Sequence, residues 1–173
     1  CAILGMGLPT TAAYIVCATA IAPALTGLGV STLAAHLFLL YFASLSAITP
    51  PVAVAAYAAA GIAEENPMKV GFTAVKLGIT GFILPFAFAL NPDYITFHFD
   101  MQTLMTWLSG LVIAYSLAIA FQGYVEKKIT LFERAGYLLV IVLSITPYFW
   151  NSLIGIALFA VLYGARQWQA KKI

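Results

Sequence analysis

Two short clusters of glycine, proline and threonine could supply the chemistry of this chain. They are residues 5–11 (GMGLPTT) and residues 47–51 (AITPP), and both interrupt long apolar sequence. Proline has no backbone N–H and disfavours helix in the residue before it. Each cluster is therefore expected to break a helix. A break leaves carbonyl groups unpaired on its upstream side and N–H groups unpaired at the start of the downstream helix.

These unpaired groups could bind ions without any charged side chain. Carbonyl oxygens and a threonine hydroxyl are hard ligands that suit Na⁺, and the positive end of a helix attracts a carboxylate. Residues 1–63 contain no Asp, Glu, Lys or Arg, so the breaks would carry much of the polarity of this region. The alternative is a pair of packing kinks, because Gly, Pro and small residues are common in membrane helices. Two breaks of one kind in one uncharged region favour a binding site of the transporter type.

The composition is that of a protein embedded in a membrane. Hydrophobic residues make up 63% of the chain and charged residues 8%, whereas a soluble domain has about 25% charged residues. In a bilayer, a broken helix is tolerated only where it faces protein or a water-filled cavity. We expect an all-α, polytopic integral membrane protein with discontinuous or re-entrant helices. The net charge of +2 does not indicate nucleic-acid binding, because the few basic residues lie mostly in predicted loops.

Five apolar regions qualify, in whole or in part, as spans of about 20 residues. The second is split by Thr49-Pro50-Pro51, and the fifth is cut into two short helices by residues 147–151, with Pro147 in the turn. The third is expected to be one uninterrupted span. The regions are Thr11–Leu28, Leu33–Ala63, Val70–Leu90, Thr103–Phe121 and Ala135–Ala165.

Basic residues in alternate loops orient these spans. Residues 91–102 and 148–151 contain no Lys or Arg, so the positive-inside rule places them outside. The cytoplasmic loops are then residues 64–69, 122–134 and 166–173, which contain Lys69, Lys127, Lys128, Arg134, Arg166, Lys171 and Lys172.

The two clusters and their flanks resemble the large membrane subunit of TRAP transporters. The similar segments are residues 3–15, 22–25 and 47–63, and the closer match is the type in which the small and large membrane subunits are fused. The resemblance is specific over residues 1–92, which we expect to be the C-terminal part of the transport core. Residues 103–173 resemble the extra C-terminal helices of fused permeases and would form a scaffold. Because the chain starts at Cys1 inside an apolar run, we expect it to be the C-terminal part of a longer permease.

The resemblance implies a secondary transporter driven by a sodium gradient, with an elevator mechanism and no cofactor besides Na⁺ as the coupling ion. Its partners would be an extracytoplasmic solute-binding protein, the remaining N-terminal part of the permease, and an organic acid substrate. The location would be the cytoplasmic (inner) membrane of a bacterium or archaeon. Carried over by position, the sodium ligands would come from Gly5, Gly7, Pro9, Ala47 and Thr49, and the substrate would meet Thr10, Thr11, Pro50 and Pro51. Relatives often have Gly after Pro-Pro-Val, where this chain has Ala53.

Two other classes of function compete with a transporter. An intramembrane enzyme would need a nucleophile with a base, or metal ligands, at membrane depth. Ser44 and Ser46 have no His–Asp partner nearby, and His36 lies in apolar sequence without an acid, which indicates packing. We therefore expect no enzyme activity and no catalytic residue. A non-transporting assembly subunit would suit the portion after Gln102. The substrate, and whether the second break is a hairpin tip or a discontinuous span, stay open.

Overall fold

A computed structural model describes residues 1–96, 100–125, 127–146 and 148–170. The chain forms two compact units, Cys1–Ala89 and Leu90–Ile173, which we call unit 1 and unit 2 and describe separately. Pro147, Lys171 and Lys172 lie outside the described residues, so the predictions made for them are not examined further. The assignment of the two parts of the chain to transport core and scaffold stays a prediction.

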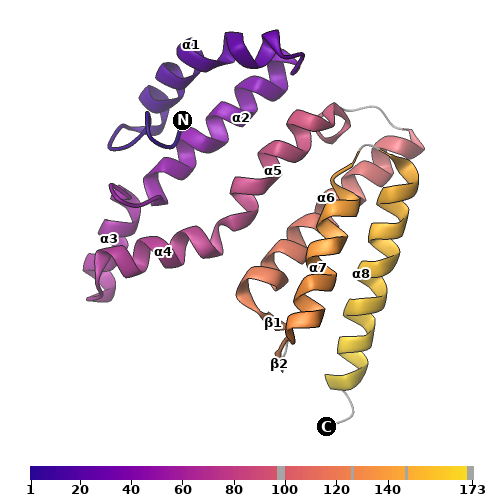
Figure 1. Ribbon diagram of the computed structural model, residues 1–173. Coiled ribbons are helices and arrows are strands. Elements are labelled where there is room, and N and C mark those ends of the chain that lie inside the picture. Colours follow the sequence, from indigo (N-terminus) through magenta and orange to yellow (C-terminus); the bar gives the residue numbers. More distant parts are fainter. Residues whose placement is uncertain (97–99, 126, 147, 171–173) are drawn as a thin grey trace. The chain divides into compact units, whose positions relative to one another are not determined.

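Unit 1 is built from short helices joined by breaks (Figure 1). They are α1 (Thr10–Gly27), α2 (Thr32–Leu45), the 3-10 turn η1 (Ser46–Ile48), α3 (Val54–Ala63), α4 (Pro67–Leu77) and α5 (Ile79–Leu90). α1 and α2 pack side by side as a hairpin, around a core that includes Cys17, Ala22 and Leu39. The Ser31 hydroxyl caps α2 by accepting from the Ala34 N–H at 3.3 Å. α3 packs on η1 and α4.

The prediction that Val70–Leu90 is uninterrupted is wrong, because α4 and α5 meet at a bend of 41°. α4 ends at Leu77, and the N–H of its C-cap residue Gly78 donates to the Ala74 carbonyl at 2.8 Å. Glycine weakens a helix and allows close approach of a neighbour. A Cβ at Gly78 would lie 3.1 Å from Ile48 Cδ1, and one at Gly81 would lie 3.3 Å from Leu45 Cδ2. The bend therefore places two glycines against the end of α2 and η1.

Unit 2 contains η2 (Pro92–Tyr94) and a bundle of three helices, α6 (Met101–Gln122), α7 (Leu131–Ser144) and α8 (Phe149–Ala170). A two-residue antiparallel ribbon, β1 (Tyr124–Val125) and β2 (Lys127–Lys128), connects α6 to α7. The prediction of two short helices within Ala135–Ala165 is wrong for the second, since α8 has 22 residues. α8 continues beyond the apolar region because the residues that follow, Arg, Gln and Ala among them, are acceptable helix formers.

The all-α membrane fold is confirmed. Among the described residues, α1, α6 and α8 are long and apolar enough to cross a membrane, and the bent pair α4–α5 would be a fourth span. α2 with η1 and α3 are shorter apolar helices, as the split of region Leu33–Ala63 predicts.

Candidate ion and substrate site

The structure brings the first break into contact with Ser46 and Val52, the residues on either side of the second break, within unit 1. The Ser46 hydroxyl donates to the Gly5 carbonyl at 3.2 Å, and the Ser46 side chain is 2% exposed. Gly5 is buried, and a Cβ added to it would lie 2.9 Å from Ser46 Oγ. Only glycine fits at position 5 without displacing the other break. Sequence analysis considered Ser46 only as a nucleophile and missed this role, because nothing in the pattern pairs residues so far apart.

The first break is a series of turns that leads into α1. The Gly5 N–H donates to the Cys1 carbonyl at 2.8 Å, and the Leu8 N–H donates to the Gly5 carbonyl at 3.2 Å. Gly7 has φ 75°, a left-handed conformation that glycine adopts readily. A Cβ at Gly7 would lie 3.6 Å from Val52 Cγ1, so Gly7 also faces the second break.

The start of α1 is open. Pro9 is its N-cap residue and, having no polar side-chain group, makes no capping hydrogen bond. The Ala13 N–H donates to the Pro9 carbonyl at 2.9 Å, and Thr10 and Thr11 occupy the first two helical positions with exposed side chains. The first N–H groups of α1 are therefore oriented as in the anion sites found at helix N-termini.

The second break frees oxygen atoms in the way the prolines predict. Thr49 has extended backbone (φ −93°, ψ 117°), and its hydroxyl donates to the Leu45 carbonyl at 2.7 Å. The lone pairs of this hydroxyl remain available to a cation. Pro51 has no N–H to offer the Ala47 carbonyl, and in the described part of the chain no donor bonds to that carbonyl.

Ala53 explains why glycine would suit the position after Pro-Pro-Val. It is fully buried, precedes α3 and has φ 32° and ψ 51°. A left-handed residue with a Cβ costs about 1–2 kcal/mol, and this cost is absent for glycine. The Ala53 N–H donates to the Thr49 carbonyl at 3.2 Å, which holds the left-handed turn against the break.

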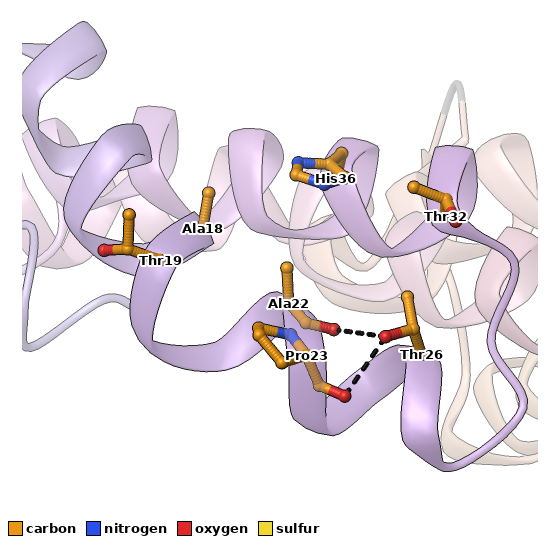
Figure 2. Close-up of a pocket in the computed structure, with 7 residues that line it drawn as sticks. All are labelled: Ala18, Thr19, Ala22, Pro23, Thr26, Thr32 and His36. Atoms are coloured by element: carbon orange, nitrogen blue, oxygen red, sulfur yellow. Dashed lines mark hydrogen bonds between the residues drawn. The ribbon is translucent and has the colours of Figure 1, made fainter.

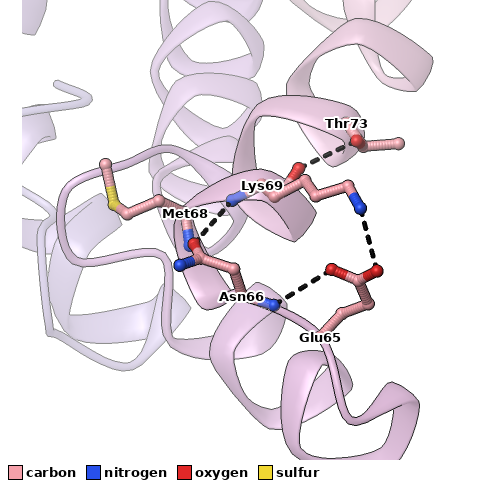
Figure 3. Close-up of polar contacts among 5 residues, drawn as sticks. All are labelled: Glu65, Asn66, Met68, Lys69 and Thr73. Atoms are coloured by element: carbon pink, nitrogen blue, oxygen red, sulfur yellow. Dashed lines mark hydrogen bonds and ion pairs between the residues drawn. The ribbon is translucent and has the colours of Figure 1, made fainter.

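α3 and the start of α4 support the second break from one side, and Figure 3 shows the loop between these two helices. The Tyr57 hydroxyl donates to the Pro51 carbonyl and lies 3.4 Å from the Met68 sulfur. Asn66 caps α4 by accepting from the N–H groups of Met68 at 3.0 Å and Lys69 at 3.2 Å.

Lys69, the basic residue of this loop, pairs with Glu65 at 2.8 Å (Figure 3). The hydrogen bond from Lys69 holds the pKa of the Glu65 carboxyl below its usual value, with help from the Asn66 N–H. The two charges of this exposed pair are thus directed at each other and not at the breaks.

A separate, mostly apolar groove of about 490 Å³ lies on α1 and α2, near the turn that joins them (Figure 2). The Thr26 hydroxyl, which lines it, donates to the Ala22 and Pro23 carbonyls, both at 3.1 Å. His36 also lines the groove, and its Nδ1 lies 2.8 Å from the Tyr14 hydroxyl. The histidine is half-buried and hydrogen-bonded, as expected for a packing residue.

The breaks therefore offer carbonyl and hydroxyl oxygens together with the open start of a helix. Over the described residues, no cluster of three or more His, Cys, Asp or Glu side chains could hold a metal ion. The chemistry that this arrangement can perform is the binding of a hard monovalent cation or an anion by neutral groups.

Comparison with known proteins gives one match. The model of a family described as "Tripartite ATP-independent periplasmic transporter, DctM component" matches residues 1–103. No curated protein and no solved structure matches the chain. The matched segment contains both breaks and every helix of unit 1.

Proposed function

This chain belongs to the family of the DctM component of tripartite ATP-independent periplasmic transporters, and on that premise we propose that it carries the ion and substrate site of a sodium-coupled importer of small organic acids. The family is one of membrane permeases that work with a solute-binding protein and a small permease component. Sodium coupling, the organic acid and a bacterial or archaeal cytoplasmic membrane belong to the proposal.

The observation that carries the proposal is the contact between the two breaks. The Gly5 carbonyl, the Thr49 hydroxyl and the Ala47 carbonyl, to which no donor bonds among the described residues, thus lie on neighbouring segments of unit 1. Neutral oxygens of this kind, supplied by unwound backbone, are what transporters use for Na⁺. Because residues 1–63 contain no Asp or Glu, the ligands that this segment offers to the ion would be dipoles.

Ser46 would release the Gly5 carbonyl for coordination when the ion binds. In this structure, that carbonyl accepts from both Leu8 N–H and Ser46 Oγ. The Ser46 hydroxyl has a second acceptor, the Ala43 carbonyl, at 2.7 Å. Because one hydroxyl proton can turn fully to Ala43, the Gly5 lone pair can be released to Na⁺ without leaving the buried serine unpaired.

The organic acid would meet the open start of α1. The N–H groups there attract a carboxylate, and the exposed Thr10 and Thr11 hydroxyls can bond to its oxygens. Pro50 and Pro51, with no N–H groups, would contribute an apolar wall beside it. An elevator movement of this region remains part of the proposal.

The test is uptake by the reconstituted permease with its solute-binding protein, measured against external Na⁺. Thr49→Ala should raise the half-saturating Na⁺ concentration about tenfold, as expected for one lost ligand dipole. Thr73→Ala is the matched control, because the Thr73 hydroxyl makes the same bond one helical turn back, to the Lys69 carbonyl at 2.8 Å (Figure 3). That control should behave as wild type.

Two outcomes would contradict the proposal at different levels. Wild-type Na⁺ activation in Thr49→Ala would remove Thr49 from the site. Wild-type uptake that persists without a Na⁺ gradient would remove sodium coupling altogether.

A second role is favoured for unit 2, most of which lies beyond the matched segment. Its helices pack through small buried polar residues such as Ser109, Ser116 and Ser144, as membrane helices do at their contacts. We propose that unit 2 is a scaffold. Thr103→Ala should then leave Na⁺ activation unchanged, and a shifted activation would place unit 2 in the transport path.

A further inference from the structure

One end of unit 2 gathers basic side chains, and we propose that it binds the head groups of anionic phospholipids. The basic end consists of Lys127, Lys128, Arg134 and Arg166, at the ribbon between α6 and α7 and beside the last turns of α8 (Figure 1). This inference is independent of sodium coupling and of the substrate.

The carboxylate of Glu133, an acidic residue at the basic end, is engaged in contacts within unit 2. Its carboxylate accepts from the Thr130 N–H at 2.6 Å and from the Thr130 hydroxyl at 2.9 Å, and it pairs with Arg166 at 3.2 Å. Arg166 is 13% exposed and also donates to the Lys128 carbonyl. These contacts connect α7, α8 and the ribbon. The charges of Glu133 and Arg166 neutralise each other.

Three basic side chains remain exposed. Lys127, Lys128 and Arg134 are exposed, and none forms an ion pair among the residues that the structure describes. Glu126, at the ribbon tip, lies outside the described residues. Even with Glu126 counted, four basic residues stand against two acids in this part of the sequence. The outward charge is therefore positive.

Exposed apolar side chains surround these cations. Leu131 is 82% exposed and Phe132 91%, both in the first turn of α7, and Tyr124 and Trp168 are more than half exposed. A binding site for a soluble anion does not require such neighbours. Side chains of this kind sit at the boundary between head groups and acyl chains, next to cations that attract anionic lipid. The combination selects a lipid surface as the occupant.

The experiment measures lipid binding to the purified permease in neutral detergent micelles. Fluorescent phosphatidylglycerol is titrated against fluorescent phosphatidylcholine with the same chains. Wild type should bind phosphatidylglycerol more tightly, and added salt should weaken that preference. Lys127→Gln combined with Lys128→Gln should weaken phosphatidylglycerol binding roughly ten- to thirtyfold, at about fivefold per cation. Phosphatidylcholine binding should not change.

Two controls separate charge from folding. Lys127→Arg with Lys128→Arg keeps both charges and should retain the preference. Lys69→Gln removes an exposed lysine that is already paired with Glu65, and it should have no effect. If the glutamine variant does not fold, the charge-conserving variant and the salt titration of wild type still decide the question.

Three results would overturn the proposal. Equal wild-type affinity for the two lipids would show that charge plays no part. Full phosphatidylglycerol binding by the glutamine variant would place the lipid elsewhere. Competition by water-soluble glycerol phosphate as effective as that by the lipid would indicate a free-anion site.

Discussion

The Ser46 hydroxyl and the Gly5 carbonyl, 41 residues apart, form the hydrogen bond that joins the two interrupted segments of unit 1. Gly5 presents its carbonyl to Ser46 at a place where a Cβ would also meet Ala13 Cβ at 3.1 Å. The contact fixes how α1 and α2 meet at this end of their hairpin. It also gives a buried serine a choice between two acceptors, the Gly5 carbonyl in the first break and the Ala43 carbonyl in the last turn of α2.

Gly5→Ala and Ser46→Ala should show energetic coupling. Gly5→Ala overpacks the contact and should cost about 1–3 kcal/mol, and Ser46→Ala should cost about 1 kcal/mol. The double variant removes the oxygen that the new methyl group would meet at 2.9 Å. Its cost should fall below the sum of the single costs by about 1 kcal/mol, measured by chemical unfolding of the permease in micelles. Strictly additive costs would mean that the two residues do not touch.

Gly7→Ala should destabilise the permease by about 1 kcal/mol through backbone conformation and not through a clash. Its φ is 75°, but a Cβ there would find only Val52 Cγ1 at an ordinary 3.6 Å. Gly7→Asn should cost less, because asparagine tolerates the left-handed region. Gly61→Ala, in α3 with open space around it, should be neutral or stabilising. Equal effects at positions 7 and 61 would refute the conformational explanation.

Gly71→Ala should reduce the transport activity of the permease by more than any loss of folded protein would explain. A Cβ at Gly71 would lie 2.9 Å from Pro50 Cγ, so α4 must move away from the second break. We expect reduced uptake and weaker Na⁺ activation in proteoliposomes, at an unchanged protein level. Gly164→Ala, in α8 with no atom within 4 Å of the new methyl group, serves as the control. The contact with Pro50 would be irrelevant if both variants transported like wild type.

Glu133→Gln should have a pH-dependent effect on stability. The backbone N–H of Thr130 is the main cause that holds the pKa of Glu133 below its usual value of 4.5, and Arg166 adds to it. A lowered pKa means that the native state favours the charged carboxylate. Its contribution is therefore complete above pH 4.5 and is lost as the pH falls through the native-state pKa. The substitution should cost about 1 kcal/mol at pH 7.

The measurement is the thermal midpoint of variant and wild type in micelles at pH 7 and at successively lower pH below 4.5. The gap between them should shrink as wild-type Glu133 takes up its proton. Glu64→Gln, at an exposed acid in the α3–α4 loop, should show no such gap. A gap for Glu133→Gln that stays constant with pH would assign the effect to packing.

The sequence alone was sufficient for the features that depend on nearest neighbours. The lack of charge over residues 1–63 established a membrane protein, and the missing N–H groups of Pro9, Pro50 and Pro51 placed both helix breaks. The start of α1 could also be predicted, because proline stereochemistry acts locally, whereas Lys69, Arg134 and Arg166 lie in helices and not in the loops expected for them.

Tertiary structure decided the features that depend on contacts between distant residues. The bond between Ser46 and Gly5, the approach of Pro50 to Gly71 and the bend at Gly78 each require a neighbour far along the chain. Likewise, the left-handed conformation of Ala53 is held by its place between the second break and α3. A linear pattern gives the period and the ends of a helix, but packing selects which two breaks meet, since that choice minimises buried unpaired groups and voids over the whole unit.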